Sequence, residues 1–336
     1  MTGKYNNFEV SISSLPSEIL CIILKQVDWK TIYRVKAISK YFYTFVGKHL
    51  DSLPKPKVRE FEISSYSTKD TFVEGYFLLE NKANPIYINC RIDNLSQTNE
   101  GNEVEDYLMK IDLTNVGVGK IKTNGKSLVF DILNRYLKPG INVGFLEIEI
   151  NKCHNLESFS SFIQKIKHVT FFHLTKLCFS HQTILSNYTL PMIEKMTFLK
   201  ISECQCTKFV NPEMITKLFL NNNNLQWLDI SSKCNDFDVE LIQYMKSRQI
   251  TCEGEGKLHK NFTICLPYRS DMNVQHEINK HFSCGKYIIS NVSQNYGNFN
   301  YFQATKLCTG CNCQMHIGIA YINIEESRKP VCYSYV

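Results

Sequence analysis

The sequence predicts an α/β protein built in three parts: a short three-helix module, an irregular solenoid of alternating strands and helices, and a small β-rich module that contains cysteines. Three observations predict this architecture. Apolar residues recur at helical spacing in residues 15–46, an apolar strand pattern recurs from about residue 58 to 250, and the composition changes after residue 250. With 336 residues, 43% hydrophobic and 21% charged, the chain can bury a core of ordinary size.

Composition and charge exclude several classes of protein. The longest apolar run near the N-terminus, Ile19–Leu24, is too short to cross a membrane, and the first residues lack the apolar stretch of a signal peptide. We therefore expect an intracellular protein, cytoplasmic or nuclear, whose 14 cysteines are free thiols in a reducing compartment. A formal net charge of +6 is too small for a nucleic-acid-binding surface along the whole chain.

We divide the chain into four segments. Residues 1–10 are expected to form a flexible tail, residues 11–50 the helical module, residues 51–250 the strand–helix region, and residues 251–336 a module of unknown fold.

The first helix of the module is predicted to start at Pro16, since the missing N–H of proline would have no partner at a first helical position. Leu20 and Leu24 widen its apolar stripe beyond what one contact with a core requires. The stripe itself consists of Ile19, Ile22, Ile23 and Val27.

Two further short helices complete the module. The second is predicted to begin near Thr31, with one face formed by Ile32, Val35 and Ile38. The third runs from Ser39 to about Val46 and should bury Phe42 and Phe45. Three helices this short cannot bury all their apolar surface among themselves. The excess must pack on the rest of the chain or form a binding site for another protein.

Residues 15–46 resemble the F-box, whose pattern is Leu-Pro-x-Glu-Ile/Leu-Leu, then an isoleucine, Leu-Asp, a leucine, Val-Ser-Lys/Arg and an aromatic residue. Val27 and Ile32 stand where leucine is usual, and Phe42 stands in place of tryptophan. The following residues 49–63 are similar to nematode-type F-box proteins. The matches align without a gap: Leu15, Pro16, Glu18, Ile19, Leu20, Ile22, Val27, Asp28, Ile32, Ile38, Ser39, Lys40 and Phe42.

This resemblance implies the substrate-recognition subunit of a Skp–cullin–F-box E3 ubiquitin ligase. Such a chain is not an enzyme itself: its F-box docks on a Skp-type adaptor, and through it on a cullin, while the remainder captures an unknown protein substrate. The alternative is a repeat-protein interaction scaffold without a ligase role, in which the helices cover the open end of the solenoid. The expected adaptor-binding residues, some in the core of the module and some at the interface, are Leu15, Pro16, Ile19, Leu20, Ile22, Ile23, Val27, Ile32, Val35, Ile38 and Phe42.

The strand–helix region repeats one pattern: an apolar residue, two others, an apolar residue, one other and an apolar residue. The last five copies are separated by 35, 31, 22 and 29 residues, and Asn151 and Cys204 fall where a leucine-rich repeat places the Asn or Cys that caps the turn after its strand. The copies are Val58-Phe61-Ile63, Leu108-Ile111-Leu113, Val143-Leu146-Ile148, Leu174-Leu177-Phe179, Met196-Leu199-Ile201 and Leu225-Leu228-Ile230.

Helices are predicted between these strands, over residues 127–137, 158–168, 212–220 and 238–248. The alternation favours an irregular, leucine-rich-repeat-like α/β solenoid, and the rival interpretation is an ordinary α/β domain with a parallel sheet. A solenoid binds partners on its strand-lined concave face. By alternation along the strands, its exposed positions would be Glu147, Glu149, Lys200, Ser202, Asp229 and Ser231.

The last segment holds strand-like runs near residues 257–264, 287–289 and 317–324. Its run of Cys308, Cys311, Cys313 and His316 has ligand types suited to zinc but no second well-spaced pair, so we favour a cysteine-bearing turn between two strands, with Gly310 and Asn312 in the turn.

No catalytic residue is predicted, and we expect no metal and no cofactor. Gly119 and Gly125 are separated by five residues where a phosphate-binding loop has four, and His276 and His281 are five apart where a zinc-protease helix has four.

Overall fold

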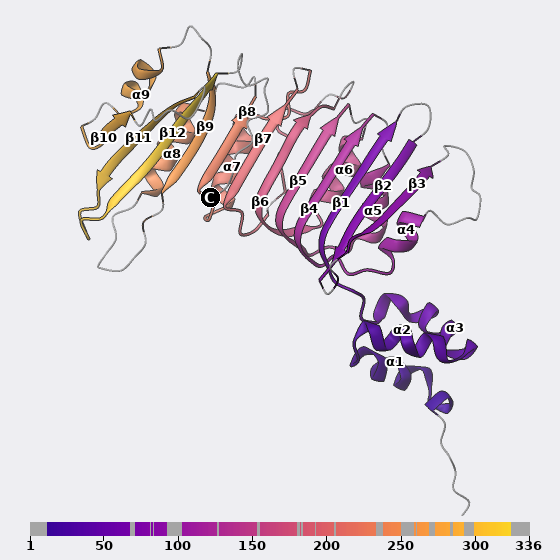
Figure 1. Ribbon diagram of the computed structural model, residues 1–336. Coiled ribbons are helices and arrows are strands. Elements are labelled where there is room, and N and C mark those ends of the chain that lie inside the picture. The colour runs from indigo at the N-terminus through magenta and orange to yellow at the C-terminus, as the bar shows by residue number, and fades with distance from the viewer. Residues whose placement is uncertain are drawn as a thin grey trace, which may run out of the picture.

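A computed structural model describes residues 12–67, 71–80, 82, 84–92, 103–125, 128–152, 155–179, 182, 184–191, 193–204, 206–232, 238–249, 259, 261–268, 273–282, 285–291 and 299–323. The tail predicted over residues 1–10 lies outside these residues. The described chain is an α/β protein in which a small helical module precedes one open, mostly parallel sheet of 12 strands (Figure 1).

Side-chain caps set the boundaries within the helical module. Asp28 precedes the second helix, and its Oδ1 atom accepts hydrogen bonds from the backbone N–H groups of Lys30 at 2.8 Å and Thr31 at 3.1 Å. This helix therefore begins two residues before the predicted start. Ser39 caps the third helix in the same way, accepting from Phe42 N–H at 3.3 Å. The helices are α1 (Ser17–Lys25), α2 (Trp29–Ile38) and α3 (Lys40–His49), with short 3-10 turns at Ile12–Ser14 and Leu50–Ser52.

The module has a hydrophobic core separate from the core of the sheet. It lies beyond the end of the strands where the chain enters the sheet (Figure 1). Phe42 and Phe45 are both buried, as predicted. The complete set of buried residues in this small core is Leu20, Leu24, Ile32, Phe42, Phe45, Val46 and Leu53. The three helices therefore form a unit whose packing does not depend on the sheet.

Parallel strands form the body of the sheet, in an order that follows the sequence except at the C-terminal end. These strands, from one side to the other, are β1 (Val58–Ser67), β4 (Asn115–Asn124), β5 (Ile141–Asn151), β6 (Ile166–Leu177), β7 (Phe198–Glu203), β8 (Trp227–Ser231), β9 (Phe262–Tyr268) and β12 (Gln314–Asn323).

Antiparallel strands complete the sheet on both sides. β2 (Thr71–Leu79) and β3 (Ile86–Ile92) follow β1, while β11 (Phe299–Leu307) and β10 (Ile288–Asn291) follow β12. β9 pairs with β8 and with β12. The residues after 250 therefore extend the same sheet, whereas the sequence predicted a small β-rich module of their own.

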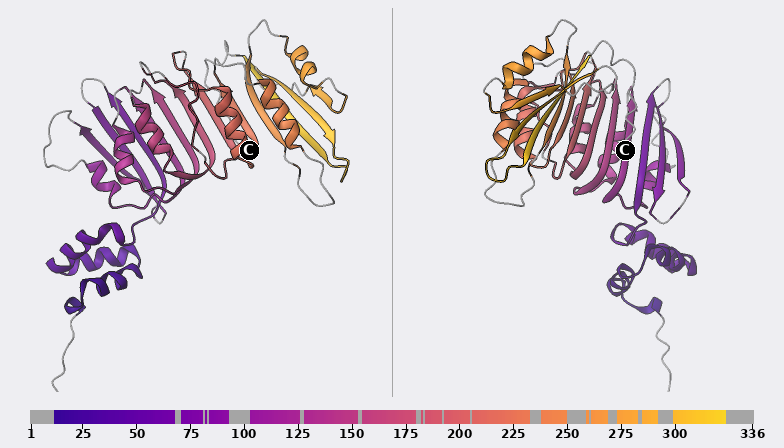
Figure 2. Two further views of the ribbon diagram at one scale, coloured as in Figure 1. Left: turned by 180° about the vertical axis from the view of Figure 1, so that it is seen from behind. Right: turned by 60° about the vertical axis from the view of Figure 1, so that its left-hand side comes forward.

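Helices cover one face of the sheet and leave the other face open (Figure 2, left). The buried face carries one continuous core along the described part of the sheet. A lysine side chain connects two neighbouring strand–helix units: Lys165 Nζ donates a hydrogen bond to the carbonyl of Leu137 at 2.7 Å, just past the end of α5. The helices are α4 (Glu103–Leu108), α5 (Val129–Tyr136), α6 (Leu156–Ile163), α7 (Pro212–Asn221), α8 (Asp238–Arg248) and α9 (Val274–Phe282).

The repeat is more regular than the sequence indicated. Register pairs place Val116 beside Val143 and Val143 beside Val169, offsets of 27 and 26 residues. The next pairs, Phe172 with Leu199 and Leu199 with Leu228, give offsets of 27 and 29. These values replace the uneven spacings read from the sequence.

Two of the predicted apolar triplets were misplaced. Leu108-Ile111-Leu113 is not a strand: Leu108 ends α4, and the strand of this unit is β4 with the triplet Val116-Gly119-Ile121. Leu174-Leu177-Phe179 lies at the end of β6, and the residues in register are Val169-Phe172-Leu174. The helix predicted over 158–168 ends at Ile163, because β6 already begins at Ile166. The helices predicted over 127–137, 212–220 and 238–248 are confirmed within two residues.

Gly119 makes β4 hard to recognise, because it stands where the other units have an aliphatic or aromatic core residue. A Cβ atom at this position would lie 2.8 Å from Cζ of Phe61 and 3.2 Å from Cδ1 of Leu146. The ring of Phe61 thus occupies the space of the missing side chain.

We expect Gly119→Ala to lower the free energy of unfolding by about 1–3 kcal/mol, the typical cost of overpacking a core. Gly47→Ala is the matched control: Gly47 lies in α3 with open space around its Cα, so alanine should stabilise that helix by about 1 kcal/mol. Urea unfolding of both variants measures the two effects. Unchanged stability of Gly119→Ala would contradict the packing described for β4.

Candidate functional site

The first helix presents apolar side chains to solvent. Ile19, Ile22 and Ile23 are exposed on α1, and their spacing places them on one face of the helix. Ile22 has 58% of its surface exposed, and Ile38, at the C-terminal end of α2, has 70%. An aliphatic side chain of this size gains about 1.5–3 kcal/mol from full burial. We call Ile19, Ile22, Ile23 and Ile38 the exposed isoleucines.

The structure divides the predicted adaptor-binding residues between the core and the surface of the module. Leu20, Ile32 and Phe42 are buried in its core, and Leu15, Val27 and Val35 pack against that core while partly exposed. Pro16 is exposed at the cap of α1. The remaining four are the exposed isoleucines. Leu20 and Leu24, which were predicted only to widen the apolar stripe of the first helix, face the core. The predicted stripe residues Ile19, Ile22 and Ile23 face solvent instead.

Sequence reasoning missed three exposed aromatic residues of the module. Tyr33 lies on α2, and Tyr41 and Tyr43 lie on α3. Partial burial raises the pKa of Tyr33 above its ordinary value. In the sequence, Tyr41 and Tyr43 stand on either side of the buried Phe42 of α3. Helical periodicity alone does not predict that they are exposed.

A second apolar feature lies on the open face of the sheet, where aromatic side chains occupy one register position of four adjacent strands. We call this set the aromatic row: Phe145, Phe171, Phe198 and Trp227. Phe198 stacks on Trp227 with ring centroids 5.7 Å apart and planes at 19°. Phe171 and Trp227 remain 41% and 40% exposed. The row forms an apolar strip directed away from the helices, because each following residue is buried on the helix face.

The aromatic row was not predicted, although its sequence signal is simple. Each member stands two residues after the first apolar residue of its strand triplet, as Phe145 follows Val143 and Trp227 follows Leu225. The positions predicted to be exposed flank the last apolar residue of each triplet and therefore do not include the row. Phe171 is harder to recognise because the triplet predicted for β6 starts at Leu174, three residues further on.

The positions predicted to be exposed on this face are more covered than expected. Asp229 is buried, because Lys200 Nζ lies 3.0 Å from its Oδ2 atom and the neighbouring strands crowd it. Lys176 pairs with Glu149 at 2.7 Å. Glu147, Glu149, Lys200, Ser202 and Ser231 are all half-buried. Charges of both signs therefore border the aromatic row, without a strong field of one sign.

His173 lies between members of the aromatic row. Its ring centroid is 4.8 Å from that of Phe145 and 5.1 Å from that of Phe198. Burial, assisted by the positive charge of Lys200, lowers the pKa of His173 to about 4. The ring is therefore neutral in the folded protein at physiological pH, which keeps the strip apolar.

This pKa predicts acid sensitivity. The unfolded chain binds a proton at His173 below pH ~6.5 while the folded chain does not, so stability should fall as the pH drops from about 6.5 to about 4. Allowing for the solvent-exposed part of the ring, we expect a loss of about 1–2 kcal/mol. His173→Phe keeps the stacking and should remove this share of the pH dependence in urea unfolding. An identical pH profile of variant and wild type would contradict the assignment.

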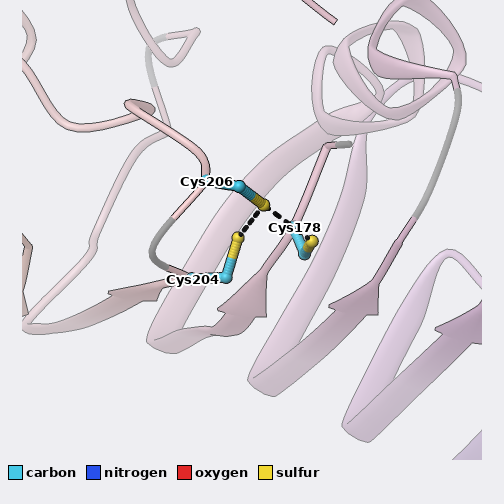
Figure 3. A group of neighbouring side chains, drawn as sticks. All are labelled: Cys178, Cys204 and Cys206. Carbon is cyan, nitrogen blue, oxygen red and sulfur yellow. Dashed lines mark hydrogen bonds between the residues drawn. The ribbon is translucent and has the colours of Figure 1, made fainter. Parts of the chain in front are cut away.

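Three cysteine thiols meet at the ends of β6 and β7 (Figure 3). The Sγ atom of Cys206 lies 2.8 Å from that of Cys204 and 3.4 Å from that of Cys178. The prediction that Cys204 caps the turn after its strand agrees with the hydrogen bond that its thiol receives from the backbone of Cys206. Its Sγ atom also contacts Thr207 Oγ1 at 3.2 Å. The cluster offers three sulfur ligands, one fewer than a structural zinc site.

Ionisation differs sharply within this three-thiol cluster. Burial and then hydrogen bonds to the other two thiols raise the pKa of Cys178 to about 12. Burial opposes ionisation of Cys204 as well, but hydrogen bonds from Cys206, Thr207 and Cys178 outweigh it and lower its pKa to about 7. A thiolate at Cys204 is thus available near neutral pH as a nucleophile or as a ligand for a soft metal ion.

The predicted turn at Cys308–Cys313 is confirmed. It joins β11 to β12, with Asn312 in the left-handed region at φ 57°. His316 is not part of the turn: it lies on β12 opposite Thr305, and its Nδ1 atom is 2.7 Å from Gln303 Nε2 and 3.0 Å from Thr305 Oγ1.

Comparisons with protein-family models, with curated proteins and with solved structures find no match to this chain. Among the helices of the described residues, none has the length and apolar character needed to span a membrane.

Proposed function

We propose that this chain is the substrate-recognition subunit of a Skp–cullin–F-box E3 ubiquitin ligase, with residues 15–46 as the F-box and the open face of the sheet as the site of target capture. One observation carries the proposal. The helical module closes a core of its own and still directs Ile22 and Ile38 to solvent. Large apolar residues that stay exposed on a small module with its own closed core are typical of a protein-binding site.

The exposed isoleucines suit the adaptor role through their placement as well as their chemistry. They project from α1 and from the end of α2, two of the segments that carry the F-box resemblance. Burying three or four such side chains in an interface supplies anchors of the kind that dominate binding energy. The buried residues of the same motif, Leu20, Ile32 and Phe42, would then act indirectly by holding the helices in place.

The regular register from β4 to β8 supports a leucine-rich-repeat-like solenoid in this part of the chain. Offsets of 26–29 residues between β4 and β8 lie within the range of about 20–29 residues for such repeats. In repeats of this kind the strands line the binding surface. The aromatic row lies on that surface and offers the exposed Phe171 and Trp227 to a target protein.

The scaffold alternative is less favoured, because it requires the helical module to cover an end of the solenoid. The edges of the described sheet are formed by β3 and β10, and the module packs around a separate core. Its exposed apolar surface would then have no purpose within the chain.

Co-purification tests the proposal. The full chain, expressed together with a Skp-type adaptor, should purify as a stable complex with the two chains in near-equal amounts, and adding a cullin should enlarge that complex. Size-exclusion chromatography with light scattering measures the stoichiometry. A monomeric chain that leaves the adaptor unbound would overturn the assignment.

A further inference from the structure

A second cluster of metal-ligating side chains lies at the far side of the sheet from the helical module, beside the turn that joins β11 to β12. Cys308 and Cys311 of this turn meet His259, which precedes β9, and their ligand atoms all lie within 4.8 Å of one another. His259 Nε2 is 3.0 Å from Cys311 Sγ. Cys313 of the same turn lies outside this group of three but makes a side-chain hydrogen bond with Cys311. Nitrogen and sulfur donors from two distant segments thus converge.

We propose that His259, Cys308, Cys311 and Cys313 bind a zinc ion as a structural site of three thiolates and one imidazole. Tetrahedral zinc holds sulfur at about 2.3 Å and nitrogen at about 2.0–2.1 Å, which places neighbouring ligand atoms about 3.5–4 Å apart. The ligand atoms of His259, Cys308 and Cys311 already lie within 4.8 Å of one another, close to that spacing. The exposed side chain of Cys313, on the same loop, would rotate toward them to complete the four ligands. Thiolates and imidazole favour zinc over magnesium or calcium, which prefer oxygen ligands.

The turn holds its cysteines ready for the metal. Cys308 N–H donates to the carbonyl of Cys313 at 2.9 Å, and Asn312 N–H donates to the carbonyl of Cys308 at 2.8 Å. These bonds fold the segment so that three thiols sit on one short loop. Cys308 is buried, so this ligand is shielded from solvent. Cys313 is exposed.

Strand pairing brings the histidine to this loop. β9 pairs in parallel with β12 from the pair Phe262 and Ile317 onward, so the residues just before β9 lie beside the end of the turn. Asn261 strengthens this approach, since its Oδ1 atom accepts from the backbone N–H of His316 at 3.0 Å. His259 therefore takes the place that sequence spacing had given to His316.

The chemistry of the cluster favours a divalent cation. Sulfur atoms gathered this closely repel one another when ionised, and a divalent ion would neutralise them. Binding must release the thiol protons, so the affinity for zinc should fall as the solution becomes acidic.

The site would connect two segments of the sheet that are distant in the sequence. β12 is inserted between β9 and β11 after the chain has left the sheet, and the metal would tie the entry of β9 to the β11–β12 turn. This role is independent of the proposed ligase function. The three-thiol cluster at Cys178 also has three donors within 4.8 Å, whereas the cluster at the β11–β12 turn has a further cysteine, Cys313, hydrogen-bonded to Cys311.

Two ligand variants and one control variant test the assignment. In the purified, reduced full chain, His259→Asn and Cys311→Ser should each lose one equivalent of zinc per chain by mass-spectrometric metal analysis, while the matched control His316→Asn should keep the wild-type content. Wild-type protein without zinc, or an unchanged zinc content in His259→Asn, would overturn the proposal.

Two further readouts separate metal loss from misfolding. Cobalt(II) added to the apo protein should give the visible absorption of a tetrahedral thiolate complex in wild type and in His316→Asn, and this band should be lost or altered in His259→Asn. A strong chelator should lower the melting temperature of the wild type but not that of His259→Asn, because bound metal stabilises only the folded state. Equal chelator shifts in both proteins would contradict the site.

Discussion

Replacing Ile22 by aspartate is expected to abolish binding of a Skp-type adaptor while the chain remains folded. Ile22 is 58% exposed on α1, so the new carboxylate is hydrated in the free protein. In the complex the same group would be buried in an apolar interface without a partner, which is costly. Truncating an interface anchor alone costs about 2 kcal/mol or more. We therefore expect the dissociation constant of the complex, measured by isothermal titration calorimetry, to rise about 100-fold or more.

Two control variants make this result specific. Leu220→Asp places the same charge on an exposed apolar residue of another helix, α7, and should bind the adaptor like the wild type. Leu20→Ala removes a buried side chain of the module and should cost about 2–5 kcal/mol of stability, with loss of helical circular dichroism. Full adaptor affinity of Ile22→Asp would place the interface elsewhere.

Local signals in the sequence were sufficient to find the helices of the module but not to orient them. Helical spacing identified α1, and Asp28 and Ser39 supply the caps that separate it from the next two helices. The first helix is apolar around most of its circumference, so periodicity did not distinguish the inner from the outer face. That choice is made by Phe42 and Phe45 of α3, which pack on the side of Leu20.

The strand triplets show a different limit of sequence reasoning. β6 is long enough to match the pattern twice, since Leu174 belongs both to the register triplet and to a second one that ends at Phe179. Burial of Leu177 and Phe179 makes the wrong match as apolar as the correct one. In β4 a glycine takes the central place and Phe61 fills it from the neighbouring strand, a compensation that no pattern within one strand reveals.

The cysteine turn was recognised from its residues, but its histidine partner was not. Spacing favoured His316 because it is near in the sequence, whereas the cluster contains His259. Only the parallel pairing of β9 with β12, a contact between distant segments, brings that imidazole to Cys311. Metal sets assembled across a sheet are for this reason poorly predicted from spacing.

The aromatic row leads to the second large effect, on the capture of targets. Phe171→Ser with Trp227→Ser should remove the two most exposed rings of the row and weaken target binding by at least about 30-fold, because aromatic anchors of this kind are each worth about 2 kcal/mol or more. Adaptor binding should not change, since the isoleucines lie on the separate module. Quantitative mass spectrometry of proteins bound to the adaptor-deficient Ile22→Asp chain, with and without the double substitution, measures the loss.

Tyr87→Ser is the control, because Tyr87 is an aromatic residue on the edge strand β3, away from the row, and is even more exposed, at 73%. Proteins whose recovery falls with the double substitution and stays constant with Tyr87→Ser are bound by the aromatic row. If every partner survives the double substitution, the open face is not the capture surface. Targets would then have to bind the helix-covered side or the sheet edges, where strand addition to β3 or β10 is the chemistry available.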